Sequence, residues 1–221
     1  MKLALITPQF APNLYDLASM LKSEQVIWLD IEPWSRKGRT HRAELRNADG
    51  TQWINIPILS EDKKKPIREV RIDHSEPWLE AFWNGILHNY QHATWFDFFE
   101  DELFSDIQYA RECQFLFEFN AYFFQRLCAY LELDINISHA SELSKYDSNP
   151  EQAAANLGAN EFYIEHQSKN YLWQSDKALV ALQRHPNYRQ AHPGFIEGCS
   201  ILDLLLNEGK ESYKVLSALF S

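Results

Sequence analysis

The sequence predicts an α/β fold: a mixed, partly parallel sheet opened by a βαβ unit, with a β-hairpin layer and an inserted helical segment at about 77–132. Three observations support this prediction. A strand–loop–helix–strand pattern occupies residues 2–30. Alternating apolar residues flank a tight turn at residues 47–50. Aromatic residues then recur at helical spacing through the inserted segment. We expect the 221 residues to form one domain over 1–221.

The opening segment has the order of elements of a βαβ unit. A short apolar run at 2–6 ends at a proline-rich loop, residues 7–12, because proline removes backbone donors. Apolar residues then recur at helical spacing over 14–21, and 25–30 is a second apolar run. Such a unit pairs its strands in parallel, and ligands of such sheets gather beyond the carboxyl ends of the strands. Residues 7–12 and 30–34 are therefore candidate site segments.

A β-hairpin is predicted next. Residues 41–46 and 51–57 flank Asn47-Ala48-Asp49-Gly50, a sequence typical of a tight turn. The run at 67–72 is expected to join this β layer. Helices are predicted over 77–91, 95–103 and 106–132, where an aromatic stripe is more typical of a core than of a cofactor site. The later elements are expected to be strands at 135–138, 161–164 and 178–183 and helices at 150–157, 200–208 and 210–220.

The charge of the chain is unevenly distributed. The formal net charge is -10, so the protein as a whole repels phosphodiester backbones and anionic lipid, and we expect neither nucleic-acid binding nor membrane insertion. Residues 36–71 carry ten positive and five negative side chains, or +5, which leaves -15 for the rest. Either a small anionic ligand binding there or a solvated hairpin face accounts for this basic segment.

Other classes of site are not supported. The three cysteines, Cys113, Cys128 and Cys199, form no C-x-x-C pair, and the sequence begins without a signal-like apolar run, so we expect a reducing, cytoplasmic location. No Walker A loop, G-x-S-x-G elbow or dinucleotide fingerprint occurs, and no cofactor is predicted. His88 and His92 have the spacing of two metal ligands on one helix face, but the sequence fixes no third ligand, and no metal is predicted.

The last quarter of the chain holds the densest group of polar candidates. His185, Tyr188 and Gln190 follow the strand predicted at 178–183, which places an imidazole, a phenol and an amide near the edge of a sheet. Ser200 and Asp203 fit the S-x-x-D form of a capping box, in which both side chains satisfy the first turn of a helix. The same helix N-terminus is an alternative site for an anion or a hydroxyl group.

Several motifs together resemble those of the WbqC-like family, whose proteins are encoded in bacterial surface-polysaccharide gene clusters. They are TPQFAP at 7–12, DIE at 30–32, WINIPI at 53–58 and the closing HPNYRQ at 185–190 with SILDLLLNEG at 200–209. Thr7 stands where the family usually has glutamine, and Tyr15 where it usually has glycine. The resemblance implies a role in polysaccharide (O-antigen) biosynthesis, with the proposed transfer of an aminoacyl or acyl group onto a sugar.

Three functions are compatible with these observations. The first is a transferase acting on an activated sugar, with a small-molecule substrate whose diphosphate the basic segment would hold. The second is a nucleotide-binding, nucleotidyltransferase-like α/β protein, and the third is a non-catalytic binding or scaffold protein. For the transferase, the candidate bases are His185, Asp203 and Asp30. The candidate substrate-binding residues are Gln9, Arg36, Arg39, Arg42, Tyr188, Gln190 and Ser200.

Overall fold

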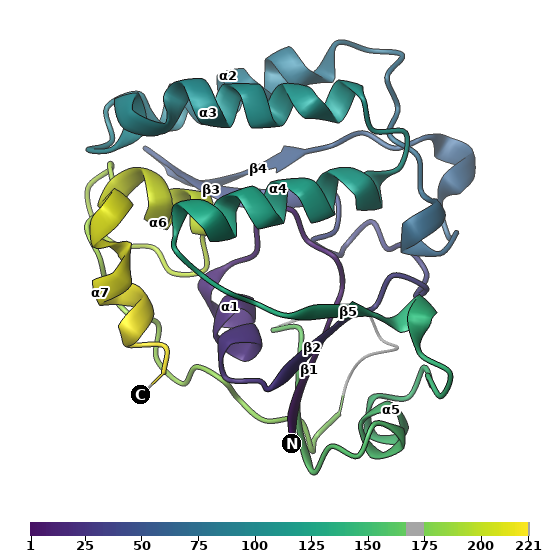
Figure 1. Ribbon diagram of the computed structural model, residues 1–221. Coiled ribbons are helices and arrows are strands. Elements are labelled where there is room, and N and C mark those ends of the chain that lie inside the picture. The colour runs from purple at the N-terminus through teal and green to yellow at the C-terminus, as the bar shows by residue number, and fades with distance from the viewer. Residues whose placement is uncertain (167–174, 221) are drawn as a thin grey trace.

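A computed structural model, which describes residues 1–166 and 175–220, confirms the mixed α/β fold. Its centre is a four-stranded sheet in the order β5–β2–β1–β6, in which every neighbouring pair is parallel (Figure 1). The strands are β1 (Lys2–Ile6), β2 (Gln25–Trp28), β5 (Ile137–His139) and β6 (Glu161–Ile164). The predicted opening βαβ unit is thus confirmed, with α1 (Leu14–Leu21) between β1 and β2.

Alternate residues of the two central strands lie in different apolar cores. Ile6 and Trp28 belong to a large core that includes the helices above the sheet, whereas Leu5 and Ile27 belong to a smaller core beneath it. Because side chains alternate between the faces of a strand, a strand that is covered on both faces must be apolar throughout. This accounts for the uninterrupted apolar runs LALI and VIW in the sequence.

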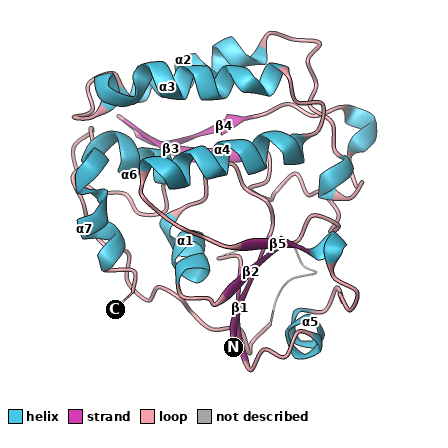
Figure 2. Cartoon of the chain, viewed as in Figure 1, coloured by secondary structure: helices cyan, strands magenta, loops and turns pink. Residues whose placement is uncertain are grey.

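The hairpin forms a second, separate β layer. Strands β3 (Arg42–Asn47) and β4 (Gly50–Asn55) pair antiparallel, with Asn47 opposite Gly50 across the turn. Figure 2 shows this hairpin between the α2–α3 helices and α4, and α2 packs directly on it. The hairpin prediction is confirmed.

Helices make up the rest of the large core. Helices α2 (Trp78–Tyr90), α3 (Phe96–Gln108) and α4 (Leu116–Tyr130) bury their aromatic stripes. Helix α4 lies over the sheet, where Phe124 packs on Trp28 with their ring centroids 5.6 Å apart. Helix α5 (Pro150–Asn156) covers the opposite face. The chain ends with α6 (Ile201–Glu208) and α7 (Ser212–Ser217).

Three sequence predictions of local structure were wrong. Residues 67–69 form a 3-10 turn, and Ile72 makes only an isolated bridge, to Ile58, so 67–72 is not a strand. The helix predicted from 106 begins at Leu116, because α3 continues to Gln108 and a 3-10 turn follows. Only Leu179 of 178–183 pairs with the sheet, through one parallel bridge to Tyr163.

Candidate functional site

The polar site lies at the switch point of the sheet, where the direction in which successive strands are added reverses. Strand β1 is flanked by β2 on one side and by β6 on the other: the chain passes from β1 to β2 and β5 on one side, and then crosses to β6 on the other side of β1. In open parallel sheets the carboxyl ends of such a strand pair form the crevice that most often binds ligand. Thr7 comes directly after β1 and Glu165 directly after β6. Both side chains therefore lie at this switch point.

Two buried carboxylates meet there. Asp16, in the first turn of α1, is fully buried, and Glu165 is 5% exposed. Asp16 Oδ1 accepts a hydrogen bond of 2.7 Å from the backbone N–H of His166, and Asn13, the N-cap of α1, accepts from the backbone N–H of Asp16 at 2.9 Å. The helix cap and the strand end thus fix both acids against each other.

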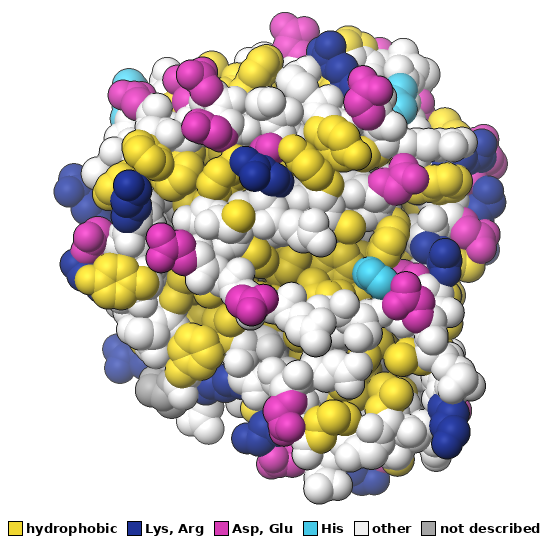
Figure 3. Space-filling model, in the orientation of Figure 1, with side chains coloured by type: hydrophobic (Ala, Val, Ile, Leu, Met, Phe, Trp, Pro, Cys, Tyr) yellow, Lys and Arg dark blue, Asp and Glu magenta, His cyan; other side chains and the backbone are white. Residues whose placement is uncertain are grey.

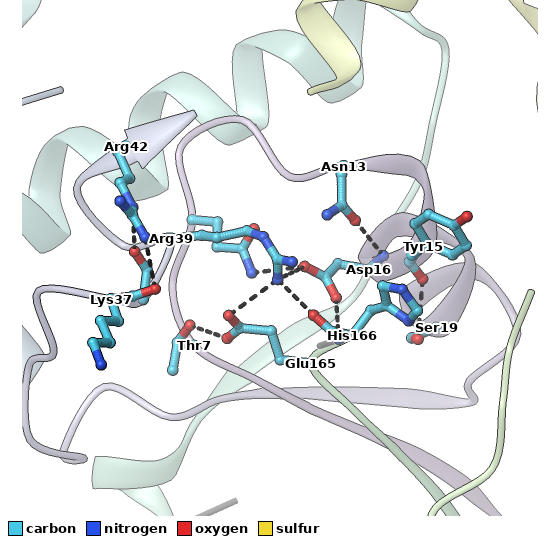
Figure 4. A network of polar contacts seen from close by, with 12 residues as sticks. Thr7, Asn13, Tyr15, Asp16, Ser19, Lys37, Arg39, Arg42, Glu165 and His166 are labelled. Carbon is cyan, nitrogen blue, oxygen red and sulfur yellow. Dashed lines mark hydrogen bonds and ion pairs between the residues drawn. The ribbon is translucent and has the colours of Figure 1, made fainter. Parts of the chain in front are cut away.

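Arg39 bridges the two carboxylates, as Figure 4 shows. Its Nη1 lies 3.3 Å from Asp16 Oδ2 and 3.4 Å from Glu165 Oε1, and it donates at 2.8 Å to the carbonyl of His166. One guanidinium therefore faces two carboxylates. Buried charges are costly without partners, and this cluster has one cation for two possible anions.

Gln9 and Thr7 complete the cluster. Gln9 Nε2 donates to Asp16 Oδ2 at 3.1 Å, and the hydroxyl of Thr7 donates to Glu165 Oε2. The side-chain oxygen of Gln9 is buried and has no hydrogen-bond partner among the described residues. A buried acceptor without a donor is costly, so the position of Gln9 is not explained by its own hydrogen bonding alone.

The environment of Glu165 tunes its acidity. Burial, and after it the nearby charge of Asp16, raise the pKa of the Glu165 carboxyl, and Arg39 and the hydrogen bonds from Thr7 lower it, so that the pKa lies at about 7. A carboxyl that titrates near neutral pH can both accept and donate a proton under cellular conditions. Glu165 is therefore a candidate general base.

Glu165 lies at the wall of a cavity. Tyr15, Glu165 and His166 line a cavity of about 210 Å³ together with residues 178–182. The rings of Tyr15 and His166 stack with their centroids 4.0 Å apart, which forms a flat wall beside Glu165. The cavity thus joins a proton acceptor to an aromatic surface.

The predicted base Asp203 lies in a different network. Its Oδ1 accepts from Tyr90 at 2.9 Å, and its Oδ2 accepts from Tyr188 at 2.6 Å and from Gln190 at 2.8 Å. Asn207 donates to Oδ1 at 3.2 Å. Burial raises the pKa of Asp203, and its hydrogen bonds oppose this rise. Four donors surround a fully buried carboxyl, which ties α6 to the loop that carries Tyr188 and Gln190.

His185 lies among aromatic rings. Its Nδ1 is 2.9 Å from the carbonyl of Pro186, and its ring lies edge-on to Tyr15 at 5.2 Å. Burial lowers the pKa of His185, and its Nε2 has no partner among the described residues. Tyr15 therefore contacts the His185 ring and also lines the cavity beside Glu165.

Asp30 takes part in a third network, beyond β2. It accepts from the backbone N–H of Ser141 at 2.9 Å and from its hydroxyl at 2.6 Å, and Arg68 lies 3.7 Å away. These contacts tie the end of β2 to the segment after β5. The hydrogen bonds and ion pairs of Asp30, Asp203 and Glu165 thus define three separate polar networks.

The predicted basic residues differ in their partners. Arg39 belongs to the carboxylate site, whereas Arg42 donates to the carbonyls of Gly38 and Lys37 and stacks on Trp53 at 4.2 Å. Arg36 is exposed, with no ion pair to any of the described residues. Arg42 and Arg36, together with burial, lower the pKa of His41 to about 4, burial being the largest cause. Arg36 and Arg42 are therefore both close enough to His41 to disfavour its protonated form.

Ser200 caps α6 only through its backbone conformation. Its hydroxyl has no hydrogen-bond partner among the described residues, and Asp203 points to the tyrosines instead of back to the cap. The predicted capping box was therefore wrong. The backbone N–H of Ser200 donates to the carbonyl of Glu44 at 2.8 Å, which joins the start of α6 to the hairpin.

Sequence reasoning missed Thr7, Asp16, Glu165 and His166 as a group. The signal that could have found them is that a polar residue directly follows each of two apolar strands, Thr7 after 2–6 and Glu165 after 161–164. Within the described ranges, no three His, Cys, Asp or Glu side chains are arranged as metal ligands. No helix in these ranges combines the length and apolar character that a membrane crossing requires.

Comparison with known proteins supports the resemblance noted in the sequence. The sequence model of the WbqC-like protein family matches residues 7–215. The chain is also 25% identical over 224 residues to uncharacterized protein Rv1507c of Mycobacterium tuberculosis, covering 96% of this chain and 95% of that protein. No solved structure matches the chain.

Proposed function

Because the chain belongs to the WbqC-like protein family, we propose that it is a transferase of surface-polysaccharide biosynthesis that moves an acyl or aminoacyl group onto an activated sugar. The observation that carries the chemistry is the Asp16–Glu165 pair at the switch point of the sheet. It combines a ligand-binding position, a proton acceptor that titrates near pH 7 and a cavity that reaches it.

In this proposal Glu165 replaces His185, Asp203 and Asp30 as the general base. The Glu165 carboxylate takes the proton of an acceptor hydroxyl or amine on the sugar, and the acceptor atom bonds to the acyl carbon of the donor. The bond between that carbon and the donor's leaving group breaks, and the leaving group keeps its electron pair. Asp16 and Arg39 act as positioning residues, since they hold Glu165 and set its charge.

Arg36 is the candidate for the phosphate groups of an activated sugar. It is the residue of the predicted Arg36, Arg39 and Arg42 set that no described acceptor engages. A guanidinium binds phosphate oxygens in pairs, and the neighbouring charge of Arg42 adds to the attraction.

The proposal is tested with a panel of nucleotide sugars, each with and without an acyl-coenzyme A or aminoacyl donor. Binding is read from the shift of the thermal unfolding midpoint, and transfer from the gain in mass of the sugar. We expect Glu165→Gln to bind the sugar and to lose transfer by about a hundredfold or more, the usual contribution of a general base. Glu102→Gln, a change at an exposed helix position, is the matched control.

Two experimental outcomes would favour a function other than that of a transferase. Release of pyrophosphate from ATP would favour the nucleotidyltransferase-like alternative. A lack of stabilisation by every nucleotide sugar, with either donor present, would remove the transferase proposal and leave a binding or scaffold role.

A further inference from the structure

A second concave site lies away from the carboxylates, between α4 and the edge strand β5. Its volume is about 430 Å³, within the range of about 300–1,000 Å³ typical of small-molecule pockets. Figure 3 shows it as a hollow with an apolar floor between the surfaces of α4 and β5. Its lining includes Phe124 and Cys128 from α4, Trp28 from β2, and Ile137 and His139 from β5. None of these residues belongs to the Asp16–Glu165 network.

Three of the side chains that line this hollow carry rings: Trp28, Phe124 and His139. Trp28 lies at 5.6 Å from Phe124 and, edge-on, at 6.2 Å from His139, measured between ring centroids. Phe117 adds a further ring beside both Trp28 and His139. Rings in tilted and edge-on arrangements present both faces and edges, which is the surface that another planar ring packs against.

Two ring nitrogens in this wall have no hydrogen-bond partner among the described residues: Trp28 Nε1 and His139 Nδ1. The indole nitrogen is a donor only, and Trp28 is 1% exposed. A buried donor without an acceptor is destabilising, and a ligand that supplies an acceptor removes this cost. The imidazole of His139 can donate or accept, according to its tautomer.

We propose that this hollow binds a flat heteroaromatic ring that carries a hydrogen-bond acceptor at its edge. The ring packs against Trp28 and Phe124, and its acceptor takes the indole N–H of Trp28. The lining also includes Gln125, Asp134 and Asn136, and the carboxylate of Asp134 disfavours an anionic ligand. This site is independent of the transferase proposal, because its residues share no contact with Glu165 among the hydrogen bonds and ion pairs described above.

Quinoline and naphthalene are suitable probes because they have the same shape and only quinoline has a ring-nitrogen acceptor. Their binding is followed by NMR of the indole N–H signals of protein labelled with ¹⁵N-tryptophan, with the Trp28 signal assigned from Trp28→Phe. We expect quinoline to shift the Trp28 signal and to bind at least about threefold more tightly than naphthalene, the effect of one hydrogen bond.

A variant that fills the hollow tests the location without removing Trp28. Ala129 is exposed on the α4 wall, so Ala129→Trp is expected to fold and to weaken quinoline binding at least about tenfold. Ala81→Trp, at an exposed position on α2, is the matched control and should bind as the wild type does.

The proposal is overturned if quinoline leaves the Trp28 signal unmoved, or if the Ala129→Trp and Ala81→Trp variants bind it equally well. Loss of quinoline binding in Glu165→Gln would also overturn it, since the ring would then lie in the carboxylate site. If the protein binds quinoline but transfers no acyl group, the transferase proposal fails and the proposal for this site stands.

Discussion

The hydroxyl of Thr7 donates a hydrogen bond to the carboxylate of Glu165, although the two residues are 158 positions apart in the chain. Each follows the last residue of a strand, and the two strands are parallel neighbours in register. The contact therefore depends on the pairing of β1 with β6. Residues that sequence alone would never group form one site because the sheet brings their strand ends together.

The contribution of Glu165 to the free energy of unfolding should fall as the pH rises from about 4.5 to 7. The folded-state pKa of Glu165 is raised to about 7, mainly by burial, so the unfolded chain loses this proton first and the folded state retains it. The stabilisation is complete below pH 4.5 and is lost as the pH passes 7, by up to about 3 kcal/mol. Urea unfolding at pH 5 and pH 7.5 measures it. Glu165→Gln should lack this component, and Glu102→Gln should keep it.

Removal of the Arg39 guanidinium should raise the pKa of Glu165 above about 7. Arg39 is the largest of the groups that lower this pKa, and Arg39→Met leaves only the hydrogen bonds from Thr7 to oppose burial and Asp16. Titration of ¹³C-labelled glutamate side chains by NMR reads the change directly, and the pH at which transfer activity rises should move upward with it. Arg36→Met, which removes an exposed cation, should leave the titration of Glu165 in place. Equal titrations in both variants would contradict the assigned role of Arg39.

The Asp203 network should be a stability element. Asp203→Asn places an amide N–H₂ among four donors, so at least one buried donor loses its acceptor, at a cost of about 3 kcal/mol in unfolding free energy. The midpoint of urea unfolding measures this loss. Asp101→Asn, at an exposed position of α3, should change it little. A wild-type midpoint in Asp203→Asn, with loss of transfer, would instead restore Asp203 as a candidate base.

Two glycines should respond differently to alanine. Gly209 ends α6 at φ +49°, and a Cβ there would lie 2.1 Å from Cδ2 of Trp95, so Gly209→Ala should cost about 3 kcal/mol or more. Gly158 has φ +73° with open space around it, so Gly158→Ala should cost only about 1–2 kcal/mol. Thermal unfolding of both variants measures the difference. Equal losses would mean that the contact with Trp95 contributes nothing.

Local patterns were sufficient for most of the fold. The alternation in β4 and the apolar runs of β1, β2 and β6 predicted those strands, and Gly209 marked the end of α6. The run at 178–183 has strand-like composition, yet only Leu179 reaches the sheet. The start of α4 was placed too early, because nothing in residues 106–115 interrupts the helical spacing. The single-domain organisation stays a prediction.

The candidate site was less accessible to sequence reasoning. Gln9 and Arg39 were identified as site residues, and both contact Asp16, but for a different reason from the one predicted. A positively lined cavity was expected, whereas Arg39 is held by two acids and Arg42 by its own loop. The two buried acids meet because α1 contacts the end of β6. Neither residue spacing nor composition predicts that contact.

The sheet order also has a consequence for biosynthesis. Strand β2 follows β1 within the first 28 residues, but β6, the other neighbour of β1, is 161–164. On the ribosome, the central strand of the sheet keeps one edge unpaired until three quarters of the 221-residue chain has been translated. An incomplete chain of this protein therefore exposes an unpaired strand edge, which is a template for mispairing until β6 is made.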